Sequence, residues 1–326
     1  KSFSIPALVA LPNNIIILLA IYFSAIYDNL YILGIGTLIG AFSQVLIMIP
    51  ELRKKRFQFS FKLKLKDEYI RRFGIIAFPV ILGVSVNEIN FLIGRTIASR
   101  ITEGAISALS YSFSLTQFVN GTFAAAIAIA MYPLISKMVI EKNIKGLNST
   151  ISESINMISV IVIPITAITI AFSEEIITML YGRGAFDENA IMLTSSTLFY
   201  YSLGMLAYGY REILTRAFYA NQDSKTPMIN SAIAMILNIF LNIILSKYMG
   251  TSGLALASSI AGTFGSILLL INLNKKIIHI NVKGISIVTL KVLIASALLY
   301  VIAINLNNLL LKINLNEFIA LLISVV

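Results

Sequence analysis

The stretch that decides the fold is residues 30–72, where LYILGIGTLIGAFSQVLIMIP (30–50) runs directly into ELRKKRFQFSFKLKLKDEYIRR (51–72). The first part is an apolar run of the length that an α-helix needs to cross roughly 30 Å of hydrocarbon. The second part is rich in Lys and Arg, and its apolar residues alternate with polar ones, as in segments that lie on anionic lipid. We therefore predict a membrane span followed by an interfacial linker. Nucleic-acid binding by the basic run is the weaker interpretation.

The composition of the whole chain also favours a membrane protein. Of its 326 residues, 58% are hydrophobic and 12% are charged, whereas a soluble domain carries about 25% charged residues. One soluble core could not bury so much apolar surface. The chain has no Cys and a single His, His279, so we expect no disulfide, no thiolate metal site and no histidine-based catalysis. Nucleotide-binding and hydrolase motifs of the GxxxxGK[ST], HExxH and GxSxG types are absent from the sequence, which argues against an enzyme.

Ten apolar stretches have the length of a membrane-spanning helix. They are residues 5–26, 30–50, 73–94, 104–135, 152–172, 189–215, 228–246, 252–273, 286–306 and 313–326. Because lipid offers no hydrogen-bond partners to the backbone, each span should be helical, and the predicted fold is an all-α polytopic membrane protein. The chain starts without Met and ends within an apolar run, so we expect both ends to be truncations of a longer protein.

The Lys and Arg residues are distributed unevenly between the two sides that these spans define. When Lys1 and the 51–72 loop are placed on one side, most of the 25 basic residues fall on that side. The opposite side holds Arg95, Arg100, Arg183, Lys247 and Lys312. Basic loops stay in the cytoplasm, so we predict that the 51–72 side is cytoplasmic.

Polar side chains inside the third span indicate a cavity or a buried partner, because lipid does not solvate them. Glu88 lies between Asn87 and Asn90, and Arg95 follows near the non-cytoplasmic end. We predict that Glu88 faces a cavity and binds a proton or a cation, and that Arg95 binds phosphate through its planar guanidinium. The alternatives are a hydrogen-bonded packing carboxyl and an Arg that reaches to the membrane surface.

The fourth and sixth spans add two more groups of candidate residues. Ser114 and Gln117 belong to a hydrophilic stretch of the fourth span, which we interpret as the wall of a water-filled cavity. Arg211, Glu212 and Arg216 lie toward the cytoplasmic end of the sixth span. We consider them a candidate gate that closes through ion pairs, with simple charge anchoring as the alternative.

A candidate cation site lies on the seventh and eighth spans. Asn238 and Asn242 are four residues apart and share one helical face. Ser258 and the backbone near Leu254 lie on the next span. Neutral oxygens that converge between two helices are suited to a hard cation such as Na⁺, and the alternative is a hydrogen-bonded pair between helices.

Four strings carry a resemblance to a known family. They are RTIAS (95–99) with EGAISALSY (103–111), YGRGAFD (181–187), REILTRAFYA (211–220) running into DSKTP (223–227), and GLALASSIA (253–261). In order and spacing they resemble the MurJ/MviN family of the multidrug/oligosaccharidyl-lipid/polysaccharide (MOP) exporter superfamily. The resemblance covers nearly the whole chain.

This resemblance implies a MOP-exporter-type helical bundle with two six-helix lobes and two further C-terminal helices. Residues 1–50 would end the first lobe, 51–72 would join the lobes, 73–273 would form the second lobe, and 274–326 would form the two additional helices. It also implies a bacterial inner-membrane flippase that moves lipid II, or a related undecaprenyl-pyrophosphate lipid, by alternating access. No cofactor is implied beyond Na⁺ or H⁺ as a coupling ion, and the expected partners are membrane lipids and cell-wall synthesis proteins.

The chain departs from the family pattern at positions that carry charge in other members. Ser114 stands at the place of a cavity Arg, and Gly94 and Asn242 stand where sodium-binding members have carboxylates. We therefore expect transport to depend only weakly on Na⁺. The departures leave three alternatives open: a flippase for another undecaprenyl-linked oligosaccharide, an antiporter of the same superfamily, and a non-transporting membrane scaffold of the cell-wall machinery.

Overall fold

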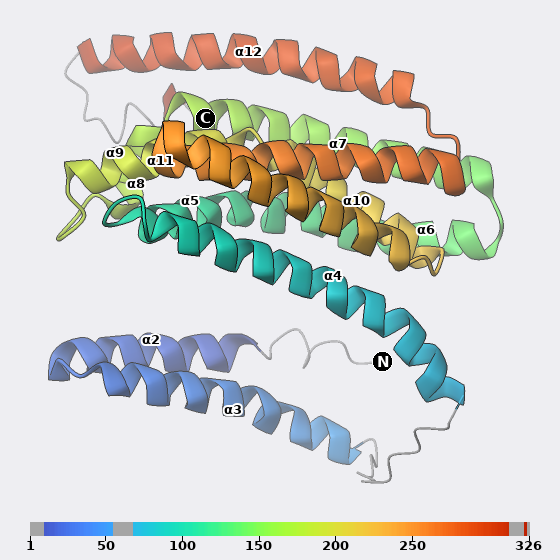
Figure 1. The fold of residues 1–326 in the computed structure, drawn as a ribbon, viewed down its shortest axis with the longest axis horizontal. Helices are drawn as coiled ribbons and strands as arrows, with labels where there is room; N and C mark the ends of the chain where they lie inside the picture. Colours follow the sequence, from blue (N-terminus) through green and yellow to red (C-terminus); the bar gives the residue numbers. More distant parts are fainter. Residues whose placement is uncertain (1–9, 55–67, 313–322, 325–326) are drawn as a thin grey trace. The chain divides into compact units, whose positions relative to one another are not determined.

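The computed structural model describes residues 10–54, 68–312 and 323–324, and the regular structure in these ranges is entirely helical (Figure 1). The chain divides into two compact units, Lys1–Asp67 and Glu68–Val326. The centre of the predicted 51–72 linker and most of the predicted span 313–326 lie outside the described residues.

The first unit is a hairpin of two apolar helices, α2 (Ala10–Tyr27) and α3 (Leu30–Lys54). The chain reverses at Asp28, whose φ is 46°, and the Ser24 hydroxyl donates to the carbonyl of Asn29 at 3.0 Å. The helices approach closely at Gly36, where a Cβ would lie 2.2 Å from the Cβ of Ala20. Such small-residue contacts allow the dispersion attraction that holds helices together in lipid.

The second unit contains the remaining elements. They are α4 (Glu68–Ala98), α5 (Ala105–Val119), the π-helical turn η1 (Asn120–Ala124), α6 (Ala125–Ile140), α7 (Ile144–Ala171), α8 (Ser173–Tyr181), α9 (Glu188–Ser202), α10 (Met205–Ala220), α11 (Lys225–Lys276) and α12 (Val282–Lys312). Over both units, the described residues contain seven helical stretches that are long and apolar enough to cross a membrane, or eight if α9 and α10 form one span, with α5 to α6 and α11 each counted once.

Helix α11 is two antiparallel helices joined at Gly250, which explains its length of 52 residues (Figure 1). Gly250 has φ 58° and ψ −134°, a conformation that only glycine adopts readily. Just after the turn, a Cβ at Gly253 would lie 2.3 Å from the carbonyl oxygen of Leu245. The sequence-based prediction of two spans, 228–246 and 252–273, is therefore confirmed.

The predicted span 189–215 consists of two helices rather than one. Helices α9 and α10 are bent by 46° at the break between them. At that break, Gly204 packs so closely on α11 that a Cβ would lie 2.9 Å from the Cα of Ser259. The Ser259 hydroxyl also donates to the carbonyl of Tyr200 at 2.7 Å. These tertiary contacts set the bend, and the hydropathy of the sequence does not reveal it.

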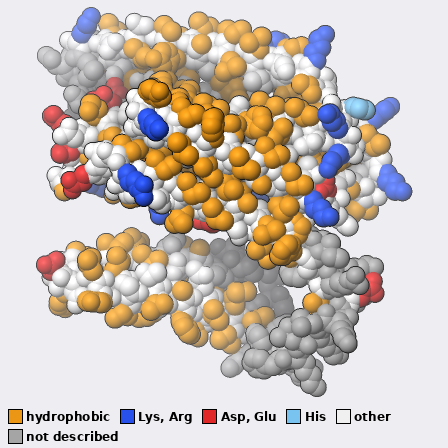
Figure 2. Space-filling model, in the orientation of Figure 1, with side chains coloured by type: hydrophobic (Ala, Val, Ile, Leu, Met, Phe, Trp, Pro, Cys, Tyr) orange, Lys and Arg blue, Asp and Glu red, His pale blue; other side chains and the backbone are white. Residues whose placement is uncertain are grey.

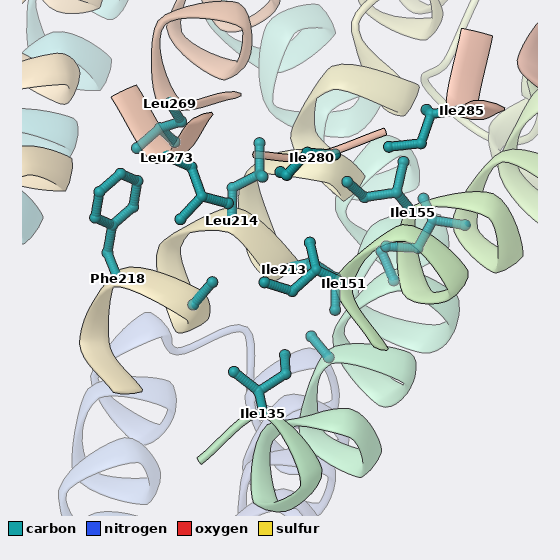
Figure 3. Packing of buried hydrophobic residues seen from close by; sticks show 14 of the residues in the cluster. Ile135, Ile151, Ile155, Ile213, Leu214, Phe218, Leu269, Leu273, Ile280 and Ile285 are labelled. Carbon is teal, nitrogen blue, oxygen red and sulfur yellow. The ribbon is translucent and has the colours of Figure 1, made fainter. Parts of the chain in front are cut away.

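The packed interior of the second unit joins α6, α7, α10, the second half of α11 and the segment that leads into α12 (Figure 3). Its labelled members are Ile135, Ile151, Ile155, Ile213, Leu214, Phe218, Leu269, Leu273, Ile280 and Ile285. The hydrophobic effect contributes little between helices that are surrounded by lipid. Close packing of these branched side chains is therefore the main attraction here.

The surface of the second unit carries a broad apolar belt between two charged ends. Figure 2 shows hydrophobic side chains over its middle, Asp and Glu gathered at one end, and Lys and Arg more frequent at the other. Large apolar residues such as Leu92, Phe118 and Ile236 are more than 60% exposed, which is the pattern of a lipid-facing surface. We refer to the two ends as the Gly250 end and the Lys276 end.

At the Lys276 end, hydrogen bonds among Asp223, Thr226 and Lys276 join the two ends of α11, and we call this group the Asp223 clasp. The Thr226 amide and hydroxyl donate to the Asp223 carboxylate at 3.0 and 2.6 Å, and the Lys276 ammonium donates to the Thr226 hydroxyl at 2.7 Å. Lys276 also lies 3.8 Å from Asp223. Burial raises the pKa of Asp223, but the hydrogen bonds from Thr226 and the charge of Lys276 outweigh burial and hold this pKa below its usual value.

Replacing Gly250 by Ala should destabilise the full-length protein in detergent by roughly 1–3 kcal/mol, because the Ala backbone resists this conformation. The measurement is the midpoint of thermal unfolding. Gly74→Ala is the control, since Gly74 lies in α4 with nothing within 4 Å of its added Cβ. Unfolding of Gly250→Ala at the wild-type midpoint would show that the turn is not strained.

The Asp223 clasp predicts a pH-dependent contribution to stability. A carboxyl whose folded pKa is depressed stabilises the fold above its unfolded pKa of about 3.9, and this stabilisation is lost as the pH falls through the folded value. Asp223→Asn should therefore lower the midpoint of thermal unfolding at pH 7, and the difference from wild type should shrink at pH 3. Glu141→Gln, which breaks only the exposed pair with Lys137, should change little at either pH.

Candidate functional site

A cavity of about 850 Å³ lies within the second unit, among α4, α5, η1, α9, α10 and α11. Most of the candidate residues from the sequence line it. They are Glu88, Asn90, Arg95, Gln117, Arg211, Glu212, Arg216, Asn238, Asn242, Leu254 and Ser258. Helices far apart in the chain thus bring the predicted substrate, cation and gate residues to the walls of one space.

Arg95 projects from α4 near the Gly250 end of the cavity. Its guanidinium carbon lies 4.2 Å from the centroid of the Phe91 ring, and its Nη2 donates to the Ser110 hydroxyl at 3.4 Å. The Phe91 ring packs in turn against Phe113, with centroids 5.6 Å apart. The aromatic face and the hydroxyl hold the cation against the wall, while the side chain stays exposed to the cavity.

The hydrophilic stretch of the fourth span divides between the cavity and the protein interior. Ser112 and Thr116 are fully buried, and the Ser112 hydroxyl donates to the Thr194 carbonyl of α9 at 2.8 Å. Ser114 is exposed but lies outside the set of cavity-lining residues, and it donates to the Ser110 carbonyl at 2.7 Å. Of the two candidate residues in this stretch, Gln117 lines the cavity and Ser114 does not. The helical periodicity of α5 directs Ser114 away from the cavity.

The other α4 candidates differ in how far the structure describes them. Glu88 is exposed and lines the cavity, as the sequence analysis predicts. Asn90 also lines it, and its buried Oδ1 has no hydrogen-bond partner. Asn87 lies within α4, but its side chain is outside the described part of the chain.

The candidate cation site is a directed chain of hydrogen bonds. The Ser258 hydroxyl donates to the Leu254 carbonyl at 3.0 Å, the Asn238 amide donates to the Ser258 oxygen at 3.3 Å, and the Asn242 amide donates to the Asn238 oxygen at 2.8 Å. Tyr208 adds a bond from its hydroxyl to the Ser258 carbonyl at 3.0 Å. The predicted convergence of these residues is present.

These residues do not fit a Na⁺ ion well. The Asn238 oxygen already accepts a hydrogen bond, and Gly94 on the adjoining cavity wall contributes no carboxylate. Within the described ranges, no group of three or more His, Cys, Asp or Glu residues could hold a metal ion. Hard cations require several oxygen ligands, usually with negative charge among them.

The candidate gate lies on α10 toward the Lys276 end. Glu212 and Arg216 form an ion pair with 3.7 Å between its closest atoms, and Arg211 donates to the Ser231 hydroxyl of α11 at 3.2 Å. Both arginines and Glu212 line the cavity together with Tyr219. These charges therefore lie in the part of the cavity wall that α10 forms toward the Lys276 end.

Several lining residues escaped the sequence analysis. Tyr201, Tyr208, Phe91 and Phe113 face the cavity, but an aromatic residue in an apolar span is usually assumed to face lipid or the core. Asn120 belongs to the hydrophilic stretch of the fourth span that the sequence analysis interprets as a cavity wall, and it lines the cavity. It begins the π-turn η1, and this wider helical turn has no signature in the residue sequence.

Comparison with known proteins places these features in a family. The sequence model described as lipid II flippase MurJ matches residues 1–324. A probable lipid II flippase MurJ of Vibrio cholerae is 32% identical over 258 residues, covering 79% of this chain and 49% of the relative. One of Buchnera aphidicola is 30% identical over 273 residues, covering 82% and 52%. The chain thus spans about half the length of the curated relatives it matches.

Solved structures agree with the sequence comparison. A lipid II flippase MurJ in an inward closed conformation matches with a TM-score of 0.77 and 27% identity, over 98% of this chain and 65% of that one. A Vibrio cholerae MATE transporter matches with a TM-score of 0.65 at 14% identity, over 84% and 63%. The second match shows a shared fold alone.

Proposed function

The chain belongs to the lipid II flippase MurJ family, and on this basis we propose that it takes part in moving lipid II across the bacterial cytoplasmic membrane. The transported molecule is a polyprenyl lipid with a diphosphate-linked saccharide headgroup. Such a headgroup cannot cross hydrocarbon unaided. A cavity within a helical bundle, with polar side chains in its wall, separates the headgroup from the lipid.

The observation that carries the proposal is the position of Arg95 in the wall of the cavity. Arginine donates two parallel hydrogen bonds to a phosphate, and the Phe91 ring and Ser110 hydroxyl leave part of its guanidinium facing the space. The apolar belt around the unit is suited to the polyprenyl chain. In this arrangement Arg95 binds the diphosphate, and Asn90 and Gln117 contact the rest of the headgroup.

Movement of the headgroup requires the cavity to open at alternate ends. We place one gate at the Lys276 end, where Arg211, Glu212 and Arg216 line the cavity. The bend between α9 and α10 and the π-turn η1 interrupt straight helices beside the same cavity. Such interruptions are where helices change their angle at low energetic cost.

No cofactor enters this proposal, and coupling to Na⁺ at the Asn238–Asn242 pair is not part of it. The pair is neutral, and the Asn238 oxygen already accepts a hydrogen bond from the Asn242 amide. Glu88 is the cavity carboxyl that could carry a proton instead. The membrane potential remains a driving force that needs no ion site.

Three alternatives differ from lipid II flipping in substrate or role. Another undecaprenyl-linked oligosaccharide would use the same diphosphate contact, and its identity would depend on the rest of the headgroup. A scaffold that binds cell-wall synthesis proteins would not need Arg95 to face the cavity. The MATE match supports an antiporter at the level of the fold only.

Replacing Arg95 by Ala in the full-length gene should abolish growth of a bacterium depleted of its own flippase, because the phosphate loses a charged hydrogen-bond donor. The expected loss in headgroup affinity is on the order of tenfold to a hundredfold. Arg100→Ala is the matched control, since Arg100 lies in the turn after α4 and does not line the cavity. Normal growth of Arg95→Ala at equal membrane levels would refute the phosphate role.

Transport in proteoliposomes should change less than about twofold when Na⁺ replaces K⁺ at equal ionic strength, because the Asn pair supplies no negative charge. The measurement is the rate at which a labelled lipid II reaches the opposite leaflet. A steep and saturable requirement for Na⁺ would contradict the neutral assignment of this pair.

A further inference from the structure

Asn242 has a buried oxygen that the rest of the protein leaves without a partner. The residue is 2% exposed, its Oδ1 has no hydrogen-bond partner, and it lines the cavity. A buried acceptor without a donor is unfavourable, so such groups usually meet a water molecule or a ligand.

The hydrogen bonds of the neighbouring residues orient the Asn242 amide. The Ser258 hydroxyl donates to the Leu254 carbonyl and accepts from the Asn238 amide nitrogen. The Asn238 oxygen faces Asn242, which presents its nitrogen there. The direction of the chain therefore leaves the Asn242 oxygen as its open end.

Arg95 and Asn242 lie at about the same level of the cavity. Helix α4 runs beside the first half of α11 in the same direction, because Gly83 lies against Met228 and Ile101 lies against Gly250. Both helices rise about 1.5 Å per residue, so Arg95 is roughly level with Asn242. Asn90, whose Oδ1 is also unpartnered, lies on α4 about one turn away.

We propose that Asn242 is a specificity-determining residue that accepts a hydrogen bond from a hydroxyl or amide N–H of the transported headgroup. This inference rests on the proposed function, in which Arg95 binds the phosphates of the same molecule. A cation on α4 and unpartnered amide oxygens on α4 and α11, at about the same level of the cavity, match a saccharide whose donor groups adjoin a diphosphate. Amide groups that must hydrogen-bond a ligand reject molecules that lack the donor.

The test compares two lipids on one protein. Full-length wild type and Asn242→Leu, in lipid nanodiscs, are titrated with lipid II and with undecaprenyl diphosphate, which has the diphosphate but no saccharide. Asn242→Leu should weaken the binding of lipid II by about tenfold and change that of undecaprenyl diphosphate by less than twofold. Ser258→Ala should give a smaller loss of the same selectivity, because it removes the group that directs the chain.

The control is Asn156→Leu, because Asn156 also has a buried, unpartnered oxygen but lies on α7 outside the cavity lining. It should leave the ratio of the two affinities unchanged. An unchanged ratio in Asn242→Leu would overturn the inference and assign the oxygen to a water molecule or a cation. An equal loss for both lipids would also overturn it, as general damage to the fold. Binding of neither lipid by wild type would overturn the proposed function itself.

Discussion

The structure depends on the inability of lipid to hydrogen-bond the groups that it surrounds. Backbone groups are satisfied within helices, and polar side chains turn inward to one another or to the cavity. Ser112, Thr116 and Ser259 give their hydroxyl hydrogens to carbonyls of the bundle. Asn90, Asn120 and Asn242 line the cavity and keep a side-chain oxygen without a hydrogen-bond partner, so they are candidates for contact with a ligand.

The order and type of the helices could be predicted from the sequence because both depend on local properties. Apolar runs predicted the spans, and Gly250 lies where hydropathy divides residues 228–273. The pairing of Asn238 with Ser258 followed from helical spacing and from the adjacency of consecutive spans. Each of these features depends on residues that lie near one another in the sequence.

Features that arise from contacts between distant residues could not be predicted. The break between α9 and α10 depends on how closely Gly204 meets Ser259 on α11. The short helix α8 is too brief for a hydropathy window, and the π-turn at Asn120 adds a residue to a helical turn without changing composition. The unpartnered oxygen of Asn242 belongs to a set of hydrogen bonds that includes the one between Asn238 and Ser258, which joins the two halves of α11.

We propose that an aqueous, headgroup-binding cavity lies within an otherwise lipid-facing unit. This chain has no Cys, so a single introduced thiol reports on its own surroundings. Gln117 lines the cavity, whereas its neighbour Phe118 is 67% exposed and does not. We expect a membrane-impermeant maleimide to label Gln117→Cys and not Phe118→Cys, and lipid II to protect Gln117→Cys from labelling. Equal labelling at the two positions, or no protection by lipid II, would contradict it.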